Sequence, residues 1–441
     1  MNIRLLKFKY CNIDRMINKL LVVVVLLLLS CQTVRKIPRS QDTKKIFNTS
    51  TTPPSYFVGF SLYDLTEKEF LIHINDDHYF TPASNTKIVT LAAYLNLNLE
   101  RIPSFLINKD QHHANIIALG DPTFLHPDFK IQPAFDYLKS LQFDTLIFNP
   151  PLAPITHYGP GWAWDDYPFY FQAERSWMPL YGNALSFNKT KNGYQVIPDF
   201  FTAFVDFKSS KTTRSPNYNL FSLSNQVNRP DTLNVHLPFI IDTELIKNLL
   251  ADTLPQAIVI GRSSELKPWT LIEGPEVTPV LTLMMDRSDN FLAEQLLVNG
   301  QRYKGFETID QYINYLKITL FADLNDPLIW VDGSGLSRYN MITPRNLVRI
   351  LEKIYEMTDW PTVTTLFPDN SDLMVAGPAE SLPFLFAKTG TLRHNHCLSG
   401  YLITKSGKKL IFSFMNNHYT GPTSEISSEM YKILSQIRDK Y

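Results

Sequence analysis

The stretch TPASNTKIVT, residues 81–90, places a serine and a lysine three positions apart at the start of an apolar run. The run continues to Leu95, so the helix expected to start near Ser84 is predicted to be buried on all sides and central to its domain. Ser84 and Lys87, at i and i+3, share one face of that helix. A neutral lysine amine can remove a hydroxyl proton, so the pair suits a nucleophilic serine.

Two further motifs follow in order along the chain. SDN, residues 288–290, opens the predicted helix NFLAEQLL, and KTG, residues 388–390, lies inside the predicted strand FLFAKTGTL. Serine–lysine pairs at the same spacing also begin at three other positions, Ser186, Ser264 and Ser406. The spacing alone therefore decides nothing, whereas the ordered set resembles that of penicillin-binding proteins and class A β-lactamases.

The chemistry assigns a role to each of the two lysines. Ser84 would attack a peptide carbonyl and form an ester while Lys87 takes its proton. An ordinary lysine has a pKa near 10.4, so a working base needs a shift of about three units, or roughly 4 kcal/mol. Lys388 is expected to supply part of that shift by repulsion, and burial the rest. Lys388 would also attract an anionic group of the substrate.

The remaining motif residues are predicted to handle protons and to orient the substrate. Ser288 would relay a proton to the leaving amine, and Asn290 would hold the substrate amide and the lysine. Gly390 lacks a side chain and would let the substrate lie as an added strand along that edge. The backbone N–H groups of Ser84 and Thr391 are the expected donors to the oxyanion.

Beyond these motifs, the chain resembles the D-alanyl-D-alanine carboxypeptidase/endopeptidase family, the class C, type-4 low-molecular-mass penicillin-binding proteins. The likeness covers nearly everything after residue 54 and includes five further segments: GDPTF (120–124), GPGWAWDD (159–166), DGSGLSRYN (332–340), TPRNLVRIL (343–351) and LSGYL (398–402). It implies a serine-type carboxypeptidase acting on peptidoglycan peptides, with D,D-endopeptidase activity as a second expectation. It also implies covalent inhibition by β-lactams and no cofactor.

The resemblance implies an α/β fold, a penicillin-recognising transpeptidase-like (β-lactamase-like) domain with an antiparallel sheet flanked by helices and interrupted by a large β-rich insertion. Residues 55–102 and 269–441 would form the catalytic domain. Residues 103–268, rich in proline, aromatics and strand-like pieces, would form the inserted domain. Residues 1–30 are expected to be a signal peptide and residues 31–54 a tether.

Three residues match the family's subsite for a diamino-acid side chain of the substrate: Asp166, Phe171 and Arg338. Lys388, Thr389, Gly390 and Thr391 would complete the substrate-binding set. The structural alternatives stay open, because Asp166 could be a turn or cap residue and Arg338 a surface ion pair.

The segment TLRHNHC directly after KTG raises the possibility of zinc, through His394, His396 and Cys397. Alternate residues of one strand point to opposite faces, so we expect no metal there. Cys397 is expected to be a small buried residue, and Arg393 to influence the preference around the substrate's side chain.

The N-terminal residues resemble a bacterial lipoprotein signal. Basic residues precede ten apolar ones, LLVVVVLLLL at 20–29, which are too few to span a bilayer, and Cys31 would receive the lipid. A short membrane anchor is the alternative, and translation could start at Met1 or Met16. We expect an exported, periplasmic protein held by its lipid, with Gln32 favouring the outer membrane.

Composition excludes one class of partner and leaves two rival functions. Lys plus Arg and Asp plus Glu both number 42, and the chain without its signal is mildly acidic, so nucleic acid is not an expected partner. A β-lactamase would need rapid hydrolysis of the acyl-enzyme, and the sequence offers no glutamate at the spacing used by class A enzymes. A non-catalytic peptidoglycan-binding lipoprotein is the third hypothesis.

Overall fold

The structure is a computed structural model that describes residues 56–190, 193–224, 235–262, 268–374 and 382–441. The expected signal peptide, tether and lipidated cysteine lie outside the described residues. Residues Pro54–Tyr441 form one compact unit. Within the described ranges, no helix combines the length and the apolar character needed to cross a bilayer.

An antiparallel five-stranded sheet carries the KTG motif. Its strand order is β14-β15-β16-β1-β2, with every neighbouring pair antiparallel. The strands are β1 Phe57–Asp64, β2 Glu69–Ile74, β14 Leu385–Leu392, β15 Asn395–Ile403 and β16 Lys409–Asn417. The strand predicted around the KTG motif is confirmed as β14. β14 is an edge strand, and its first residues are bonded on the outer side by Asn370 N, which donates to the Leu385 carbonyl over 2.8 Å.

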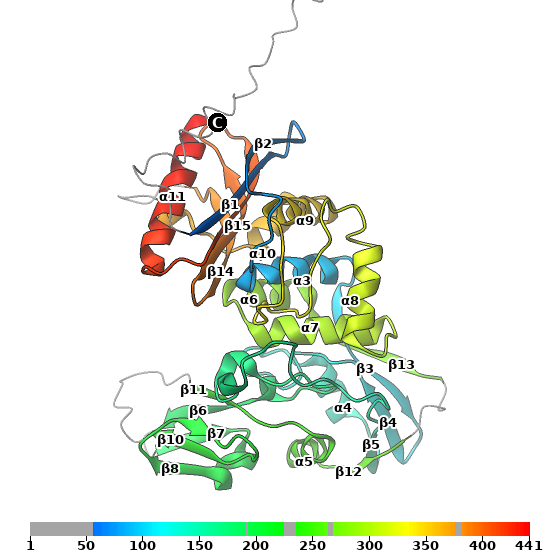
Figure 1. The fold of residues 1–441 in the computed structure, drawn as a ribbon. Coiled ribbons are helices and arrows are strands. Elements are labelled where there is room, and N and C mark those ends of the chain that lie inside the picture. The colour runs from blue at the N-terminus through cyan, green and yellow to red at the C-terminus, as the bar shows by residue number, and fades with distance from the viewer. Residues whose placement is uncertain (1–55, 191–192, 225–234, 263–267, 375–381) are drawn as a thin grey trace, which may run out of the picture. The chain divides into compact units, whose positions relative to one another are not determined.

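Helices cover both faces of this sheet (Figure 1). α11 packs against β15, whereas α9 packs against β1 and β16 and also against α3. The helices of this part of the chain are α3 Thr86–Leu95, α6 Val277–Asp286, α7 Asn290–Tyr303, α8 Ile309–Ile318, α9 Pro344–Met357, α10 Trp360–Leu366 and α11 Thr423–Lys440. The α/β fold with a flanked antiparallel sheet is therefore confirmed.

The helix α3 is buried along almost its whole length, as the apolar run predicted. Every residue from Thr86 to Tyr94 is buried. The start was predicted near Ser84, and Ser84 lies in a 3-10 turn, Ala83–Asn85, that leads directly into α3 at Thr86. Ala83 has φ 49°, a left-handed conformation that costs an alanine roughly 1 to 2 kcal/mol. Ser84 is thereby held just before the buried helix instead of inside it.

The segment between β3 and β13 forms three further sheets. A mixed sheet has the order β12-β5-β4-β3-β13, and two small sheets have the orders β8-β10-β9 and β11-β6-β7. The strands are β3 Arg101–Lys109, β4 His113–Ala118, β5 Thr145–Phe148, β6 Ala184–Thr190, β7 Gly193–Ile197, β8 Val205–Ser209, β9 Thr213–Arg214, β10 Phe221–Ser224, β11 Val235–Pro238, β12 Ala257–Ile260 and β13 Thr270–Glu276. The β-rich character is confirmed, but two helices were not predicted, α4 Pro133–Ser140 and α5 Thr243–Thr253.

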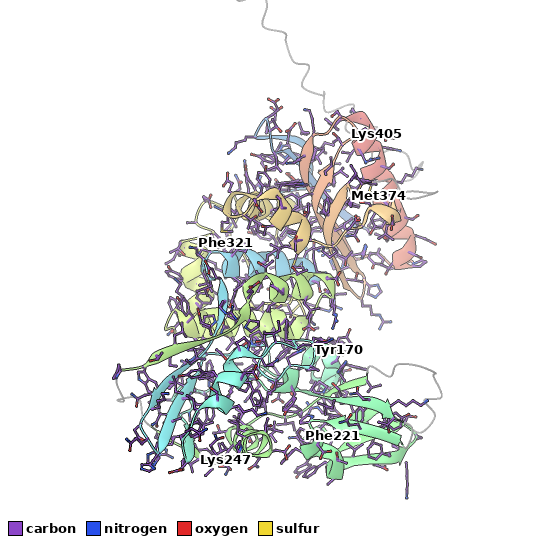
Figure 2. All side chains as sticks on the ribbon, turned by 180° about the vertical axis from the view of Figure 1, so that it is seen from behind. Tyr170, Phe221, Lys247, Phe321, Met374 and Lys405 are labelled. Carbon is purple, nitrogen blue, oxygen red and sulfur yellow. The ribbon has the colours of Figure 1, made fainter. Side chains whose placement is uncertain are left out.

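The buried hydrophobic side chains form two clusters. One gathers around α3, α7 and α9. The other draws its buried members from between Phe105 and Leu254, and Figure 2 labels Phe221 within it. The exact domain boundaries stay a prediction, and β3 and β13, at the two expected junctions, pair with each other.

Short 3-10 helices complete the fold and include several site residues. They are Ala83–Asn85, Trp164–Asp166, Tyr170–Gln172, Tyr181–Asn183, Asp199–Phe204 and Ser371–Leu373.

Candidate active site

Ser84 and Lys87 meet at the N-terminal end of α3. Lys87 Nζ donates to Ser84 Oγ over 3.2 Å. Lys87 is fully buried, whereas Ser84 is half-buried and so can be reached from outside. The i, i+3 spacing thus sets the amine against the hydroxyl, as the sequence predicted.

Two acceptors besides the serine hold the Lys87 amine. Nζ donates to Asn290 Oδ1 over 2.6 Å and to the Ser334 carbonyl over 2.8 Å. These three contacts match the three donors of an ammonium. An amide oxygen and a backbone carbonyl have no proton to give, so among the three only the Ser84 hydroxyl can donate to a neutral lysine. The geometry therefore directs a deprotonated Lys87 towards Ser84.

The electrostatics of the two lysines differ from the expectation in one respect. Burial lowers the pKa of Lys87 to about 8, and the carboxylates of Asp289, Glu294 and Asp332 oppose that lowering. Burial also lowers the pKa of Lys388 to about 7, and the positive charge of Lys87 adds to it. We expected burial and Lys388 to lower the pKa of Lys87, but we did not expect the three carboxylates that oppose this lowering; repulsion between the two ammonium groups is mutual. Both amines lose their protons between about pH 7 and 8.

The SDN motif forms the start of α7 and brings Asn290 to the lysine. Asp289 is the N-cap, and its carboxylate accepts from Leu292 N over 2.8 Å. Asn290 then has its side-chain oxygen on Lys87 and its Nδ2 on the Phe171 carbonyl at 2.9 Å. One amide thus links α3, α7 and the inserted segment.

Ser288 lies at the turn before α7 and has a positive φ of 55°. Among the residues that the structure describes, its hydroxyl makes no hydrogen bond to Lys87 or Ser84. The structure brings Ser288 to the site next to Asn290, and its role as a proton relay stays a prediction.

The KTG motif lies on the edge strand β14 and packs on the Ser84 turn. Asn85 Nδ2 donates to the Lys388 carbonyl over 2.8 Å, and Lys388 Nζ donates to the Thr389 carbonyl over 2.9 Å. A Cβ at Gly390 would lie 2.6 Å from Pro82 O and 2.8 Å from Asn85 N. The absence of a side chain at Gly390 therefore has a reason we did not expect, since it lets the strand approach the nucleophile's turn.

Thr391 is exposed at the end of the motif, and its Oγ1 lies 2.8 Å from His396 Nδ1. The positions of Ser84 on its turn and Thr391 on the edge strand are compatible with two oxyanion donors. That role stays a prediction for both N–H groups.

The expected subsite residues Asp166 and Arg338 interact electrostatically. Burial and the neighbouring Asp165 raise the pKa of Asp166, and the positive charge of Arg338 counteracts them. Arg338 is exposed, and its Nη1 lies 3.4 Å from the Arg393 carbonyl. The Asp166 carboxylate and the Arg338 guanidinium thus lie in one region, beside Arg393 in the segment that follows KTG.

Phe171 belongs to a cluster of aromatic rings next to this pair. Its ring stacks on that of Phe169 with the centroids 5.4 Å apart, and Tyr170 meets it edge-on. Tyr170 is 61% exposed, and Figure 2 shows it at the surface. The Phe171 carbonyl bonded to Asn290 ties this cluster to the SDN motif.

The other serine–lysine pairs do not form comparable sites. Ser186 and Lys189 lie on one strand, β6, where residues three apart point to opposite faces, and Ser186 Oγ bonds His236. Ser406 Oγ bonds Thr404. Ser264 lies outside the described residues.

The histidines and cysteine after KTG each contact a separate partner. His394 Nδ1 bonds the Tyr419 carbonyl, and His396 bonds Thr391. Cys397 is fully buried, and its thiol lies 3.6 Å from the Thr81 carbonyl. In the described part of the chain, no three His, Cys, Asp or Glu side chains gather as metal ligands would.

Sequence reasoning missed four buried residues in the contacts that lead from the Lys87 amine to the inserted segment. They are Arg175, Glu294, Asp332 and Ser334. Glu294 follows Asn290 by four positions on α7, so helical spacing could have indicated that both lie on one face. Nothing in the local sequence pointed to Arg175, which reaches Glu294 from 119 positions away.

Fold and site together define a class of protein. A serine and a lysine precede a buried central helix, an asparagine arrives from a second helix, and a Lys-Thr-Gly edge strand packs beside them. That is the arrangement of penicillin-recognising serine acyl-transfer enzymes. Residues 240–437 match the model of the D-Ala-D-Ala carboxypeptidase 3 (S13) family.

Similar proteins agree with this placement. The chain is 33% identical over 100 residues to the D-alanyl-D-alanine carboxypeptidase DacB of Haemophilus influenzae, covering 21% of each protein. It is 32% identical over 161 residues to the D-alanyl-D-alanine carboxypeptidase of Actinomadura sp., covering 33% of this chain and 29% of that protein. The alignments thus span less than a third of these relatives.

The fold is similar to that of a solved structure over almost the whole chain. Penicillin binding protein 4 of Haemophilus influenzae superposes with a TM-score of 0.64 at 17% identity, over 90% of this chain and 98% of that one. At this identity the likeness shows the fold.

Proposed function

We propose that the protein is a serine-type D-Ala-D-Ala carboxypeptidase that acts on peptidoglycan stem peptides through an acyl-enzyme at Ser84. The observation that carries the proposal is the Lys87 amine, which contacts Ser84 Oγ at 3.2 Å and Asn290 Oδ1 at 2.6 Å. Lys388 stands close enough for its pKa to respond to the charge of Lys87. All three motifs therefore meet at one proton acceptor.

The reaction follows from these positions. Neutral Lys87 takes the proton of Ser84 as Oγ attacks the carbonyl carbon of the penultimate D-alanine. The tetrahedral oxyanion is stabilised by the N–H groups of Ser84 and Thr391. The C–N bond then breaks, and the proton passes from Lys87, by way of Ser288, to the amine of the departing D-alanine. Water hydrolyses the ester and restores the serine. Lys388, with Thr389, binds the anionic end of the substrate.

Cleavage of D-alanyl cross-links is proposed as a second activity of the same centre. The chemistry is identical, because in both reactions the bond that breaks follows a D-alanine carbonyl. The family description and the names of the two carboxypeptidase relatives support the exopeptidase reaction. Penicillin binding protein 4 of Haemophilus influenzae has been solved in complex with a β-lactam, which supports covalent inhibition here.

A diamino-acid side chain of the stem peptide is the proposed ligand of the subsite. Asp166 would attract a side-chain ammonium and Arg338 a carboxylate, while Phe171 packs against the aliphatic part. The electrostatic interaction between Asp166 and Arg338 supports a subsite able to bind a zwitterionic group.

The rival functions make distinct demands on the site. A class A β-lactamase uses a free carboxylate to activate water, and both oxygens of the Glu294 carboxylate are engaged, by Arg175 and by Ser334 N. A non-catalytic peptidoglycan-binding lipoprotein would need none of the Lys87 contacts.

Labelling with a fluorescent penicillin and release of D-alanine from a pentapeptide test the proposal. The wild type should retain the label and release D-alanine, and Ser84→Ala should do neither. Ser406→Ala, which alters a serine in the same serine–lysine spacing, is the matched control and should behave as wild type. Equal D-alanine release by Ser84→Ala would refute the enzyme, and prompt loss of label would favour the β-lactamase.

We also propose that the protein is exported, lipidated at Cys31 and held at the periplasmic face of the outer membrane. The signal-like sequence before Cys31 and the peptidoglycan substrate support this location. Cells fed labelled palmitate should label the wild type and not Cys31→Ser. Fractionation into inner and outer membranes then tests the location, and label on both variants would contradict lipidation at Cys31.

A further inference from the structure

A buried ion pair joins the inserted segment to the helix that carries Asn290. Arg175 Nε and Nη2 donate to Glu294 Oε2 over 2.9 and 2.6 Å, and each side chain is only 2% exposed. The other carboxylate oxygen, Oε1, accepts from Ser334 N over 2.7 Å. The carbonyl of the same Ser334 accepts from Lys87 Nζ over 2.8 Å. Four groups thus form one chain of contacts from the insertion to the catalytic amine.

The Ser334 backbone cannot shift without moving its neighbours. A Cβ at Gly333 would lie 2.6 Å from Ala293 O, and a Cβ at Gly335 would lie 1.9 Å from Ala83 O. Thr90 Oγ1 donates to the Gly333 carbonyl over 2.7 Å. Residues 333–335 are therefore packed between α7 and the turn that holds Ser84, so the position of Glu294 sets the position of the Ser334 carbonyl.

A second contact from the insertion supports the same backbone segment. Trp162 Nε1 donates to Asp332 Oδ2 over 2.9 Å, and Asp332 Oδ1 accepts from Gly335 N over 2.8 Å. The Arg175 guanidinium lies 5.3 Å from the centre of the Trp162 ring. Arg175, through Glu294, and Trp162, through Asp332, therefore both support residues 332–335, the segment that contains the Ser334 carbonyl.

The energetics of burial favour a role other than stability. Desolvating two charges costs several kcal/mol, and a buried pair of this kind is often no more stabilising than apolar side chains of the same volume. An unpaired Glu294, by contrast, would place an uncompensated charge beside the Lys87 amine. Glu294 holds the Ser334 backbone in place, and the positive charge of Arg175 offsets the negative charge of Glu294 near the Lys87 amine.

We propose that Arg175 and Glu294 are positioning residues for Lys87, acting through the Ser334 carbonyl and through their opposed charges. The inference deepens the proposed function and rests on it. Through Arg175, the inserted segment would help to determine the position and the pKa of Lys87, in addition to any role in binding the substrate.

The charges around Lys87 decide whether its pKa rises or falls in each variant. Asp289, Glu294 and Asp332 favour its charged form, and Lys388 lies on the facing strand. Glu294→Gln removes an anion and leaves the Arg175 cation, so Lys87 should lose its proton at lower pH. Arg175→Gln leaves the anion uncompensated, so Lys87 should lose its proton at higher pH.

The test is the acylation rate constant with a fluorescent penicillin, measured from pH 5 to pH 10 on the whole folded protein. In the wild type the rate should rise as Lys87 loses its proton. We expect the midpoint of this rise to move down in Glu294→Gln and up in Arg175→Gln, each by about half a pH unit or more. Arg175→Lys keeps the charge but loses the two-pronged contact, so its midpoint should stay and its maximal rate should fall.

The controls separate positioning from folding and from the proposed function. Arg345, on α9, forms an ion pair with Asp326 and, among the described residues, makes no hydrogen bond or ion pair with the groups named above. Arg345→Gln removes this ion pair and should leave the pH profile unchanged. If Arg175→Gln fails to fold, Glu294→Gln and Arg175→Lys still carry the test. Equal loss of rate at every pH in Glu294→Gln and Arg175→Gln, with no shift in either midpoint, would overturn the inference. Failure of the wild type to label at Ser84 would instead overturn the proposed function.

Discussion

Gly390→Ala should separate the geometry of the site from the stability of the fold. The added Cβ would lie 2.6 Å from Pro82 O, 2.8 Å from Asn85 N and 3.0 Å from Asn85 Nδ2. Contacts of this kind are comfortable at about 3.5 Å, so β14 and the Ser84 turn must separate by roughly 0.5 to 1 Å. The first two contacts are with backbone atoms, which cannot turn aside as a flexible side chain would.

The separation should reach the chemistry directly. Asn85 Nδ2 donates to the Lys388 carbonyl across the same interface, at 2.8 Å, and that bond would be stretched or lost. Thr391, the expected oxyanion donor, follows one residue later on the strand. A misplacement of about 1 Å can reduce a rate by about a hundredfold. Overpacking of this size usually destabilises a protein by about 1 to 3 kcal/mol, which a domain of this size can tolerate.

The assay is the acylation rate constant with a fluorescent penicillin, with thermal unfolding measured on the same samples. We expect Gly390→Ala to acylate about a hundred times more slowly while remaining folded. Gly421→Ala is the matched control, because the nearest atom to its added Cβ is 3.6 Å away. Acylation of Gly390→Ala within about threefold of wild type would refute the close-approach argument.

Three further outcomes follow from buried titratable groups. The acylation rate of the wild type should rise towards about pH 8, where Lys87 loses its proton. Lys388→Met should raise the free energy of unfolding more at pH 6 than at pH 9, as chemical denaturation would show. The folded-state pKa of Lys388, about 7, lies below its ordinary value of 10.5. Between these two pH values the unfolded chain therefore binds more protons than the folded protein. The contribution of the lysine to the free energy of unfolding thus rises with pH. Cys397 should resist iodoacetamide at pH 8 in the native protein and react after denaturation, because burial raises the pKa of its thiol to about 12.

Each of these three outcomes has a result that contradicts it. A rate independent of pH from 6 to 9 would mean that neither lysine acts as the base. A stability gain for Lys388→Met that is equal at both pH values would mean that the amine is not desolvated in the native state. Rapid native alkylation of Cys397 would show that its strand opens to solvent.

The sequence by itself determined the local parts of this site. Serine and lysine at i and i+3 share one face where the chain is helical, and the apolar run from Ile88 to Leu95 predicts a buried helix there. Asp289 before α7 is a helix cap for equally local reasons.

Only the tertiary structure decided how these parts act on one another. The Arg175–Glu294 pair joins residues 119 positions apart, and no local periodicity records such a contact. The pKa of Lys87 depends on burial and on three carboxylates that gather around it only on folding. Burial and long-range contacts set these energies, because the dielectric and the distance between charges are properties of the packed molecule and not of the chain.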